Sequence, residues 1–426
     1  MRVKNVLSIK TSLVVLFLIG FVFRVFLFAI ARHGDINNNI SWGEELVMRG
    51  PINFYEGLSW TFSAPNQPPL YLYLFGFVAL VISSITSLIT YLNGHVGVFP
   101  SSLVWWWSTN GELLMAKIPS ILSDLGIAFI LYRFFEDKRK GLLAAFLWII
   151  NPVVWYNSSI WGGTDSIVNL FGLLSFYFLF KKNITWSAAF LVVSILFKGS
   201  LSLFIPLWFI VVFYQKYKIR QLFSAVALMG LITILVSYPF HPSLDLPVWL
   251  FNLYTQRFFP GEIGSLTANA FNFWWIVDSG KTLDSITYFG LSARNWGFAA
   301  LVSGYMLIIS KIRKHLDIFQ IVFAISILAV ISFLFMTRIH ERYLYPMFPY
   351  LTIYSVQRKW ARLPLAVFSV INLANLYHLF WAPGIDTLKA LYLNSNFALN
   401  LSVISILVFV VLFIGFLTMK PSKTSR

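Results

Sequence analysis

Long runs of apolar residues follow one another along almost the whole chain. A membrane-spanning helix needs about 20 apolar residues, and only short polar breaks separate runs of roughly this kind. They cover residues 11–30, 70–91, 113–134, 141–157, 166–180, 184–214, 221–239, 290–310, 317–336, 343–357, 363–382 and 396–419. The run at 184–214 has room for two short spans. The pattern predicts an all-α, polytopic transmembrane helical bundle of about 12–14 spans, which forms one membrane-embedded domain over residues 1–426.

Two longer polar segments, residues 31–69 and 240–284, interrupt this pattern. Both are poor in Lys, which places them on the face away from the cytoplasm under the positive-inside rule. Loops of this length in a compact protein are usually functional or disordered. Because both contain aromatic residues and Pro at intervals, we expect ordered outer loops.

The composition supports a membrane protein and changes how the net charge is interpreted. Hydrophobic residues make up 58% of the 426 residues and charged residues 11%, against about 25% charged in soluble domains. The formal net charge is +16, but the basic residues stand in short clusters between the apolar runs, which is typical of cytoplasmic loops and not of a nucleic-acid surface. The clusters are Arg133 with Lys138–Lys140, Lys181–Lys182, Lys216–Arg220, Lys311–Lys314, Arg358–Arg362 and Lys420–Arg426.

The same rule predicts cytoplasmic termini, and the basic stretch Met1–Lys10 leads into a first transmembrane helix with no signal-peptide cleavage pattern. One inconsistency remains in the count of spans. Counted from the first helix, the cluster Arg133–Lys140 falls on the outside, against its charge. Residues 93–112, with Trp105–Trp107, can hide a short span or a re-entrant piece, and the sequence leaves this open.

Two stretches place carboxylates at helix ends that are predicted to lie outside. Asp35 follows the first helix and stands seven positions before Trp42; it can be a functional group or simply a helix-end carboxylate. Asp165 lies in the polar stretch 151–166. That stretch can equally be a helix break whose freed backbone groups are satisfied by Ser, Thr and Asn.

Two further stretches carry cations. Residues 337–346 hold Arg338, His340 and Arg342; on a helix the two Arg residues share a face and with His340 could bind a phosphate. A solvated interfacial loop is the alternative. Arg257 lies in an aromatic stretch that, alone, indicates only an outer loop with an Arg. The chain has no Cys, and its His residues show no metal-ligand spacing.

In this order the stretches resemble the GT-C superfamily of membrane glycosyltransferases, which use polyprenyl- or dolichyl-phosphate sugars. The likeness is greatest to the lumenal glucosyltransferases of N-glycan assembly and their prokaryotic multispanning relatives. The matching pieces are Asp35 with Trp42, Pro68–Tyr71, Tyr156–Ser158 through Thr164–Ser166, Arg257–Pro260 with Asn272–Trp274, and His340–Tyr343.

The resemblance implies a GT-C-like fold and an inverting transfer of a hexose, mannose or glucose, from a polyprenyl-phosphate carrier. The acceptor would be a lipid-linked glycan, a glycolipid or another molecule at the extracytoplasmic face of the cell membrane. Asp35 would be the general base in the first outer loop, and no metal or other cofactor is implied. The donor phosphate would be bound by His340, Arg342, Arg338, Arg257 and Lys198, and the sugar or acceptor by Trp42, Glu44, Trp161, Thr164 and Asp165.

The sequence departs from the family at three places, which leaves the sugar and the acceptor open. Asp35 has no second carboxylate near it before Glu44, Arg342 stands where the glucosyltransferases have Lys, and Lys198 is not followed by Gln or Pro-Gln. Two other classes remain as alternatives: a transporter or flippase of lipid-linked saccharides, and an oligosaccharide ligase or polymerase. A transporter is typified by intramembrane charges and paired repeats; the charges seen here lie mainly at outer helix ends.

Overall fold

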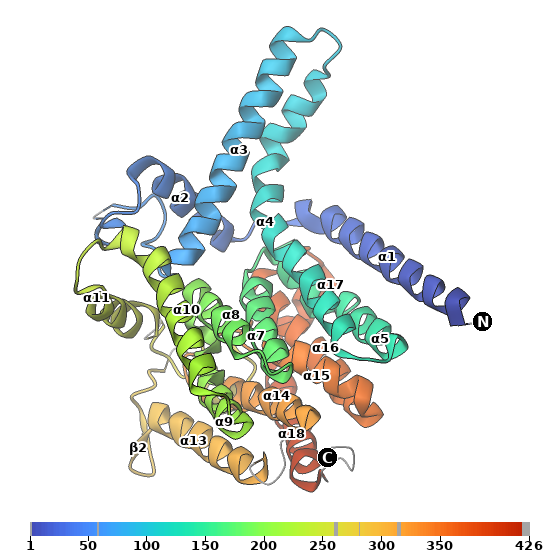
Figure 1. Ribbon diagram of the computed structural model, residues 1–426, viewed down its shortest axis with the longest axis vertical. Coiled ribbons are helices and arrows are strands. Elements are labelled where there is room, and N and C mark those ends of the chain that lie inside the picture. The colour runs from blue at the N-terminus through green and yellow to red at the C-terminus, as the bar shows by residue number, and fades with distance from the viewer. Residues whose placement is uncertain (1, 58, 260–262, 281, 313–316, 420–426) are drawn as a thin grey trace.

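The computed structural model describes residues 2–57, 59–259, 263–280, 282–312 and 317–419, and it is built almost entirely of helices (Figure 1). Pro260 and the basic residues Arg313, Lys314, Lys420, Lys423 and Arg426 lie outside the described residues. The helices are α1 (Arg2–Leu27), α2 (Gly34–Arg49), α3 (Pro69–His95), α4 (Ser101–Phe134), α5 (Lys138–Ile149), α6 (Pro152–Trp155), α7 (Asp165–Phe180), α8 (Ile184–Phe197), α9 (Ile205–Gln215), α10 (Ile219–Ser237), α11 (Leu246–Leu253), α12 (Phe273–Val277), α13 (Ala293–Ile312), α14 (Ile318–Phe335), α15 (Met347–Gln357), α16 (Arg362–Phe380), α17 (Asp386–Tyr392) and α18 (Ser395–Thr418).

The predicted all-α polytopic bundle is confirmed, although fewer of its helices are full-length spans than the sequence suggested. Within the described residues, eight helices are long and apolar enough to cross a membrane, or nine if Lys138–Ile149 and Pro152–Trp161, bent by 51° at a break, form one span. Three apolar helices of the interior are shorter: Asp165–Phe180, Ile184–Phe197 and Gly199–Gln215. The expected number was larger because an apolar run does not distinguish a full span from a short buried helix.

The segment 93–112, which the sequence left open, forms neither a separate span nor a re-entrant piece. Helix α3 continues to His95, and α4 begins at Ser101 and runs unbroken to Phe134. The two helices form a hairpin whose tip stands away from the rest of the molecule (Figure 1). The buried residues of α4 begin at Trp107 and become frequent from Leu113 onward, where the helix runs through the bundle.

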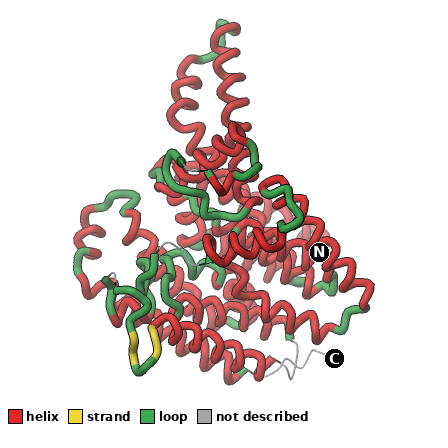
Figure 2. The backbone as a smooth tube through the Cα atoms, turned by 90° about the vertical axis from the view of Figure 1, so that its left-hand side faces the viewer, coloured by secondary structure: helices red, strands yellow, loops and turns green. Residues whose placement is uncertain are grey.

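Both polar segments carry helices, which agrees with the expectation of ordered outer loops. Residues 31–69 contain α2 and a single 3-10 turn at Phe54–Glu56, and residues 240–284 contain α11, a π-helical turn at Tyr254–Phe258 and α12. The two short antiparallel strands, β1 (Thr287–Tyr288) and β2 (Leu291–Ser292), lie at one edge of the molecule (Figure 2). That the two segments lie outside the membrane on the extracytoplasmic side stays a prediction.

A buried ion pair ties together parts of the bundle that are distant in sequence. Arg24 on α1 donates from Nε to Asp124 Oδ2 on α4 at 3.0 Å, and both side chains are fully buried. The hydroxyls of Ser158 and Tyr345 donate to the same carboxylate at 2.6 and 3.0 Å. Buried charges are costly unless they are paired and hydrogen-bonded, and here the partners come from four separate segments. The cluster therefore fixes α1, α4, the segment after α6 and the segment before α15 against one another.

Candidate active site

A small polar pocket of about 60 Å³ collects residues from five regions of the chain. It is lined by Asp35, Asn38, Asn39, Trp42, Asn66, Gln67, Tyr71, Gly162, Gly163, Thr164, Asp165, Lys198 and Arg342. Four of the charged residues singled out from the sequence, Asp35, Asp165, Lys198 and Arg342, are among them. The chain thus brings two carboxylates and two cations from positions up to 307 residues apart into one cavity.

Helix α2 presents Asp35 to this pocket. His33 is the N-cap of α2 and accepts a hydrogen bond at Nδ1 from the Asp35 N–H at 3.1 Å, and Asp35 lies in the first turn, where the helix dipole favours a negative charge. Positions three, four and seven residues later share its face, and these are Asn38, Asn39 and Trp42. The helix packs very closely on α3 at Gly43. A Cβ at this position would lie only 2.2 Å from the carbonyl oxygen of Phe75.

Asp35 forms an ion pair with Arg342 across the pocket. The distance from Arg342 Nη1 to Asp35 Oδ2 is 3.0 Å, and Trp161 Nε1 donates to the same oxygen at 3.3 Å. Enclosure in the pocket raises the pKa of Asp35, but Arg342, His33 and the Trp161 N–H outweigh it and hold that pKa below its usual value. The Asp35 side chain is still 36% exposed. It is therefore an ionised carboxylate that a molecule entering the pocket can reach.

Arg342 is held from three sides and keeps part of its donor capacity. Its Nη1 lies 3.4 Å from Glu341 Oε1 as well as near Asp35, and its guanidinium lies over the Trp161 ring at 5.8 Å. Burial alone would lower the pKa of Arg342, but Asp35, Glu341 and Asp165 raise it above its usual value. A guanidinium has five N–H donors. Among the described residues only Nη1 has a polar partner, so Nε and Nη2 remain for an anion.

A second pair of opposite charges lies deeper in the pocket. Lys198 Nζ is 3.2 Å from Asp165 Oδ1, and Asn157 Nδ2 donates to the other oxygen, also at 3.2 Å. Lys198 occupies the C-cap of α8, where the chain turns into the 3-10 segment Gly199–Phe204. Its ammonium also lies over the Tyr343 ring at 5.4 Å. The pair keeps a cation near Arg342 without burying an uncompensated charge.

The polar stretch 151–166 forms a helix break, as one of its two interpretations anticipated. Residues Tyr156–Trp161 form a π-helical turn that ends at Gly162, which has a φ of 82°. Asn157 accepts hydrogen bonds from the N–H groups of Gly162 and Gly163 at its carbonyl oxygen. The break places the Trp161 indole against Asp35 and brings Thr164 and Asp165 to the pocket. That these groups are functional stays a prediction.

Lys117 stabilises this part of the site and was missed by the sequence analysis. Its buried ammonium donates to the carbonyl oxygens of Phe28, Ala31, Ser159 and Ile160 at 2.7–2.9 Å. These carbonyls belong to the end of the first helix and to the end of the π-helical turn, where helix dipoles favour a cation. Lys117 therefore fixes the backbone shortly before Asp35 and shortly before Trp161. A Lys inside a predicted span was the available signal.

Five of the residues implied by the resemblance do not line the pocket. The first is Trp161, which is fully buried and reaches the site only through its hydrogen bond to Asp35. Glu44 is exposed, because nine positions along α2 correspond to half a turn away from Asp35. His340 lies beside Glu341 with 3.8 Å between Nδ1 and Oε2. Arg257 donates to the carbonyl oxygen of Tyr55 at 2.7 Å.

Arg338 is the fifth, and the helix that was to align it with Arg342 does not form. Helix α14 ends at Phe335 and α15 begins at Met347, and Arg338 itself has a φ of 62°. Its guanidinium binds both oxygens of Asp284, at 2.7 and 3.0 Å. Arg338 thereby holds the end of the polar segment 240–284 in place.

The described residues contain no group of three or more His, Asp or Glu side chains placed to hold a metal ion. What the pocket offers is an ionised carboxylate next to guanidinium and ammonium donors. Such a set can accept a proton at Asp35 and stabilise an anion at Arg342 and Lys198.

No protein-family model matches the chain, and no curated protein matches it in sequence. Among solved structures, the crystal structure of ArnT from Cupriavidus metallidurans in the apo state is similar, with a TM-score of 0.48 and 13% sequence identity. The similarity covers 96% of this chain and 77% of that one. A likeness at this level does not establish a shared activity, so we interpret the site from its own residues.

Proposed function

We propose that this multi-pass membrane protein is a glycosyltransferase of the GT-C type, which uses a polyprenyl-phosphate sugar as donor and the polar pocket as its active site. One observation carries the proposal. The resemblance makes Asp35 the general base, Arg342 a phosphate contact and Asp165 a sugar or acceptor contact. All three line the same cavity. Lys198 and Trp42 line it too. They come from α2, the segment before α15, α7 and α8, so their convergence is a property of the fold.

The chemistry needs one base and a stabilised leaving group. Asp35 takes the proton of the acceptor hydroxyl as its oxygen forms a bond to the anomeric carbon. The bond from that carbon to the phosphate oxygen breaks on the opposite side, and its electron pair stays on the phosphate, so the configuration inverts. A phosphate monoester has a second pKa of about 6 and leaves without a general acid. Arg342 and Lys198 stabilise the negative charge that develops on it.

The Asp35–Arg342 pair links donor binding to activation of the base. Arg342 can bind a phosphate through Nε and Nη2 while Nη1 still contacts Asp35. The incoming negative charge weakens the hold of Arg342 on Asp35 and opposes the ionised form of Asp35. The base thus becomes a better proton acceptor when the donor is in place.

The donor sugar and the acceptor are proposed from the resemblance. We propose a hexose, mannose or glucose, and an acceptor that is a lipid-linked glycan, a glycolipid or another molecule on the extracytoplasmic face. Trp42 and Tyr71 give the pocket aromatic surface, and Asn38, Thr164 and Gln67 give it amide and hydroxyl groups. This mixture suits a sugar, whose hydroxyls need hydrogen-bond partners and whose C–H faces pack on aromatic rings.

The test is the release of polyprenyl phosphate by the purified protein. Incubation with polyprenyl-phosphate mannose or glucose and a glycolipid fraction should give free polyprenyl phosphate and a product of opposite anomeric configuration. Asp35→Asn protein prepared in the same way is the control for contaminating activity. If the protein moves the intact donor between the leaflets of a vesicle and releases no polyprenyl phosphate, it is a transporter and the proposal is wrong.

A further inference from the structure

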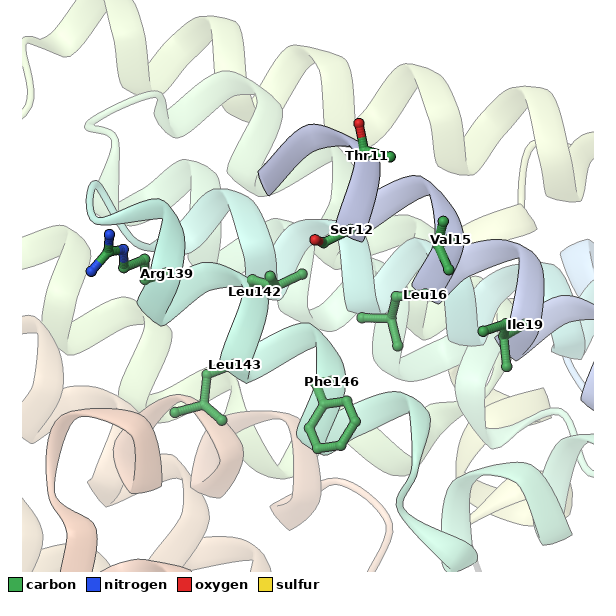
Figure 3. Close-up of a pocket in the computed structure, with 9 residues that line it drawn as sticks. All are labelled: Thr11, Ser12, Val15, Leu16, Ile19, Arg139, Leu142, Leu143 and Phe146. Atoms are coloured by element: carbon green, nitrogen blue, oxygen red, sulfur yellow. The ribbon is translucent and has the colours of Figure 1, made fainter. Parts of the chain in front are cut away.

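A groove between α1 and α5 lies on another part of the molecule. It has a volume of about 750 Å³ and is lined by Thr11, Ser12, Val15, Leu16, Ile19, Arg139, Leu142, Leu143 and Phe146. Apolar side chains of the two helices face this space, with Arg139 at one end and Ile19 at the other (Figure 3). The active-site proposal uses none of these residues.

The groove exists because the two helices touch at one end only. A Cβ on Gly20 would lie 2.9 Å from Ile149 Cγ2, and Arg24 Nη2 donates to the carbonyl oxygen of Ile149 at 3.2 Å. These contacts close the groove at its Gly20 end. Towards the start of each helix the side chains no longer meet, and Val15 and Phe146 are 46% and 44% exposed.

The length of the groove matches one leaflet of a bilayer. The eight helical steps from Thr11 to Ile19 span about 12 Å, and half of a hydrocarbon core is about 15 Å. Arg139, at the polar end of the groove, belongs to the basic cluster Lys138–Lys140. The positive-inside rule places this cluster at the cytoplasmic surface. An acyl chain of the inner leaflet would therefore lie along the apolar wall with its headgroup level with Arg139.

Arg139 differs from Lys138 and Lys140 because its charged group makes no hydrogen bond to another described residue and can bind a ligand. Lys138 Nζ donates to the carbonyl oxygen of Phe135 at 3.0 Å, and Lys140 Nζ lies 3.3 Å from Gln357 Oε1. The guanidinium of Arg139 has no such partner among the described residues and lies at the mouth of the groove (Figure 3). Asp137 caps α5 by accepting from the Arg139 N–H at 2.9 Å.

The position of the cluster on α5 also favours an anion. Lys138, Arg139 and Lys140 are the first three residues of the helix, where the helix dipole favours negative charge and opposes cations. Glu136 and Asp137 precede them and offset only two of the three charges. A phosphate at Arg139 would supply the missing negative charge and would lie near the N-terminal end of α5.

We propose that this groove is a binding site for an anionic glycerophospholipid of the cytoplasmic leaflet, with one acyl chain between α1 and α5 and its phosphate on Arg139. The site is independent of the proposed catalytic function. A single basic residue near the membrane surface contributes about 1 kcal/mol to the binding of an anionic lipid, which corresponds to about fivefold in affinity.

The experiment is native mass spectrometry of the detergent-purified full chain with phosphatidylglycerol or phosphatidylcholine of identical acyl chains. Wild-type protein should retain phosphatidylglycerol about fivefold better. Arg139→Gln should bring this ratio close to one, whereas Lys140→Gln, which removes the same charge from a side chain bound to Gln357, should keep it. Val15→Trp should reduce the binding of both lipids by obstructing the apolar wall.

Two results would overturn the proposal. The first is an unchanged preference in Arg139→Gln. The second is an equal loss in Lys140→Gln, which would show general attraction to a basic surface and no defined site.

Discussion

Replacing Asp35 by Asn is the change that best separates catalysis from donor binding. The amide keeps the shape of the side chain but cannot take the proton of the acceptor hydroxyl. General-base help is worth roughly 10²–10⁴ in rate, so turnover should fall by at least about a hundredfold. The fold should persist, because the Asp35 side chain is 36% exposed. Arg342 loses one carboxylate partner in this variant but keeps Glu341.

The ion pair adds a second, opposite expectation for the same variant. In the unliganded protein Arg342 Nη1 is bound to Asp35 at 3.0 Å, and a donor phosphate has to share that guanidinium. Charge-assisted hydrogen bonds contribute about 1.5–3 kcal/mol, but partial exposure of Asp35 screens the pair towards about 1 kcal/mol. Freed from the carboxylate, Arg342 should bind the donor up to about fivefold more tightly.

Two assays are needed, one for each half of the prediction. Donor affinity is measured without acceptor by displacement of labelled polyprenyl phosphate, and turnover by its release from the sugar donor. Glu56→Gln makes the same acid-to-amide change at an exposed position of the same outer segment and should alter neither value. Near wild-type turnover of Asp35→Asn would exclude Asp35 as the base. A large loss of donor affinity would show that Asp35 contacts the donor instead.

Three further predictions follow from individual contacts. Arg342→Gln removes the strongest influence that lowers the pKa of Asp35, so that pKa should rise; since the base works ionised, the acidic limb of the pH–rate profile should move to higher pH, and an unmoved limb would uncouple the two residues. Arg24→Leu leaves Asp124 buried without its cation and should destabilise the protein by about 3–5 kcal/mol. In thermal unfolding in detergent, the double variant Arg24→Leu/Asp124→Leu should lose less stability than the losses of the two single variants added together. Gly43→Ala places a Cβ 2.2 Å from the Phe75 carbonyl oxygen and should lower both the unfolding temperature and turnover, whereas Gly34→Ala, with open space around it, should change the unfolding temperature little.

The apolar runs were sufficient to predict the helical bundle, and the charged helix ends together with the resemblance pointed to four charged residues of the pocket. Asp35, Asp165, Lys198 and Arg342 were all singled out from the sequence, and they share one pocket. Asp35, Asp165 and Arg342 each stand next to a predicted span, where an unpaired charge is costly and a retained one is usually paired or functional. Lys198 lies inside the run at 184–214 and was named from the resemblance.

The remaining residues depend on geometry that local patterns do not contain. Glu44 was grouped with Asp35 because residues 31–69 were interpreted as a loop; in the helix α2 the two point in opposite directions. Arg338 was aligned with Arg342 on an assumed helix, but its Asp284 partner lies 54 residues away. Lys117 stands inside a run that was counted as an ordinary span, and its four carbonyl partners come from two other segments.

The length of α4 resolves the inconsistency in the count of membrane crossings. Its 34 residues extend about 51 Å at 1.5 Å per residue, well beyond a hydrocarbon core of about 30 Å. A single passage through that core therefore leaves about 20 Å of α4 beyond it. If α1 and α4 each cross once and α3 does not, the N-terminal residues and Arg133–Lys140 come to the same side, as their charges require. The α3–α4 hairpin then stands on the outer side of the bilayer core, and its exposed Trp105 and Trp106 are suited to lie among the lipid headgroups.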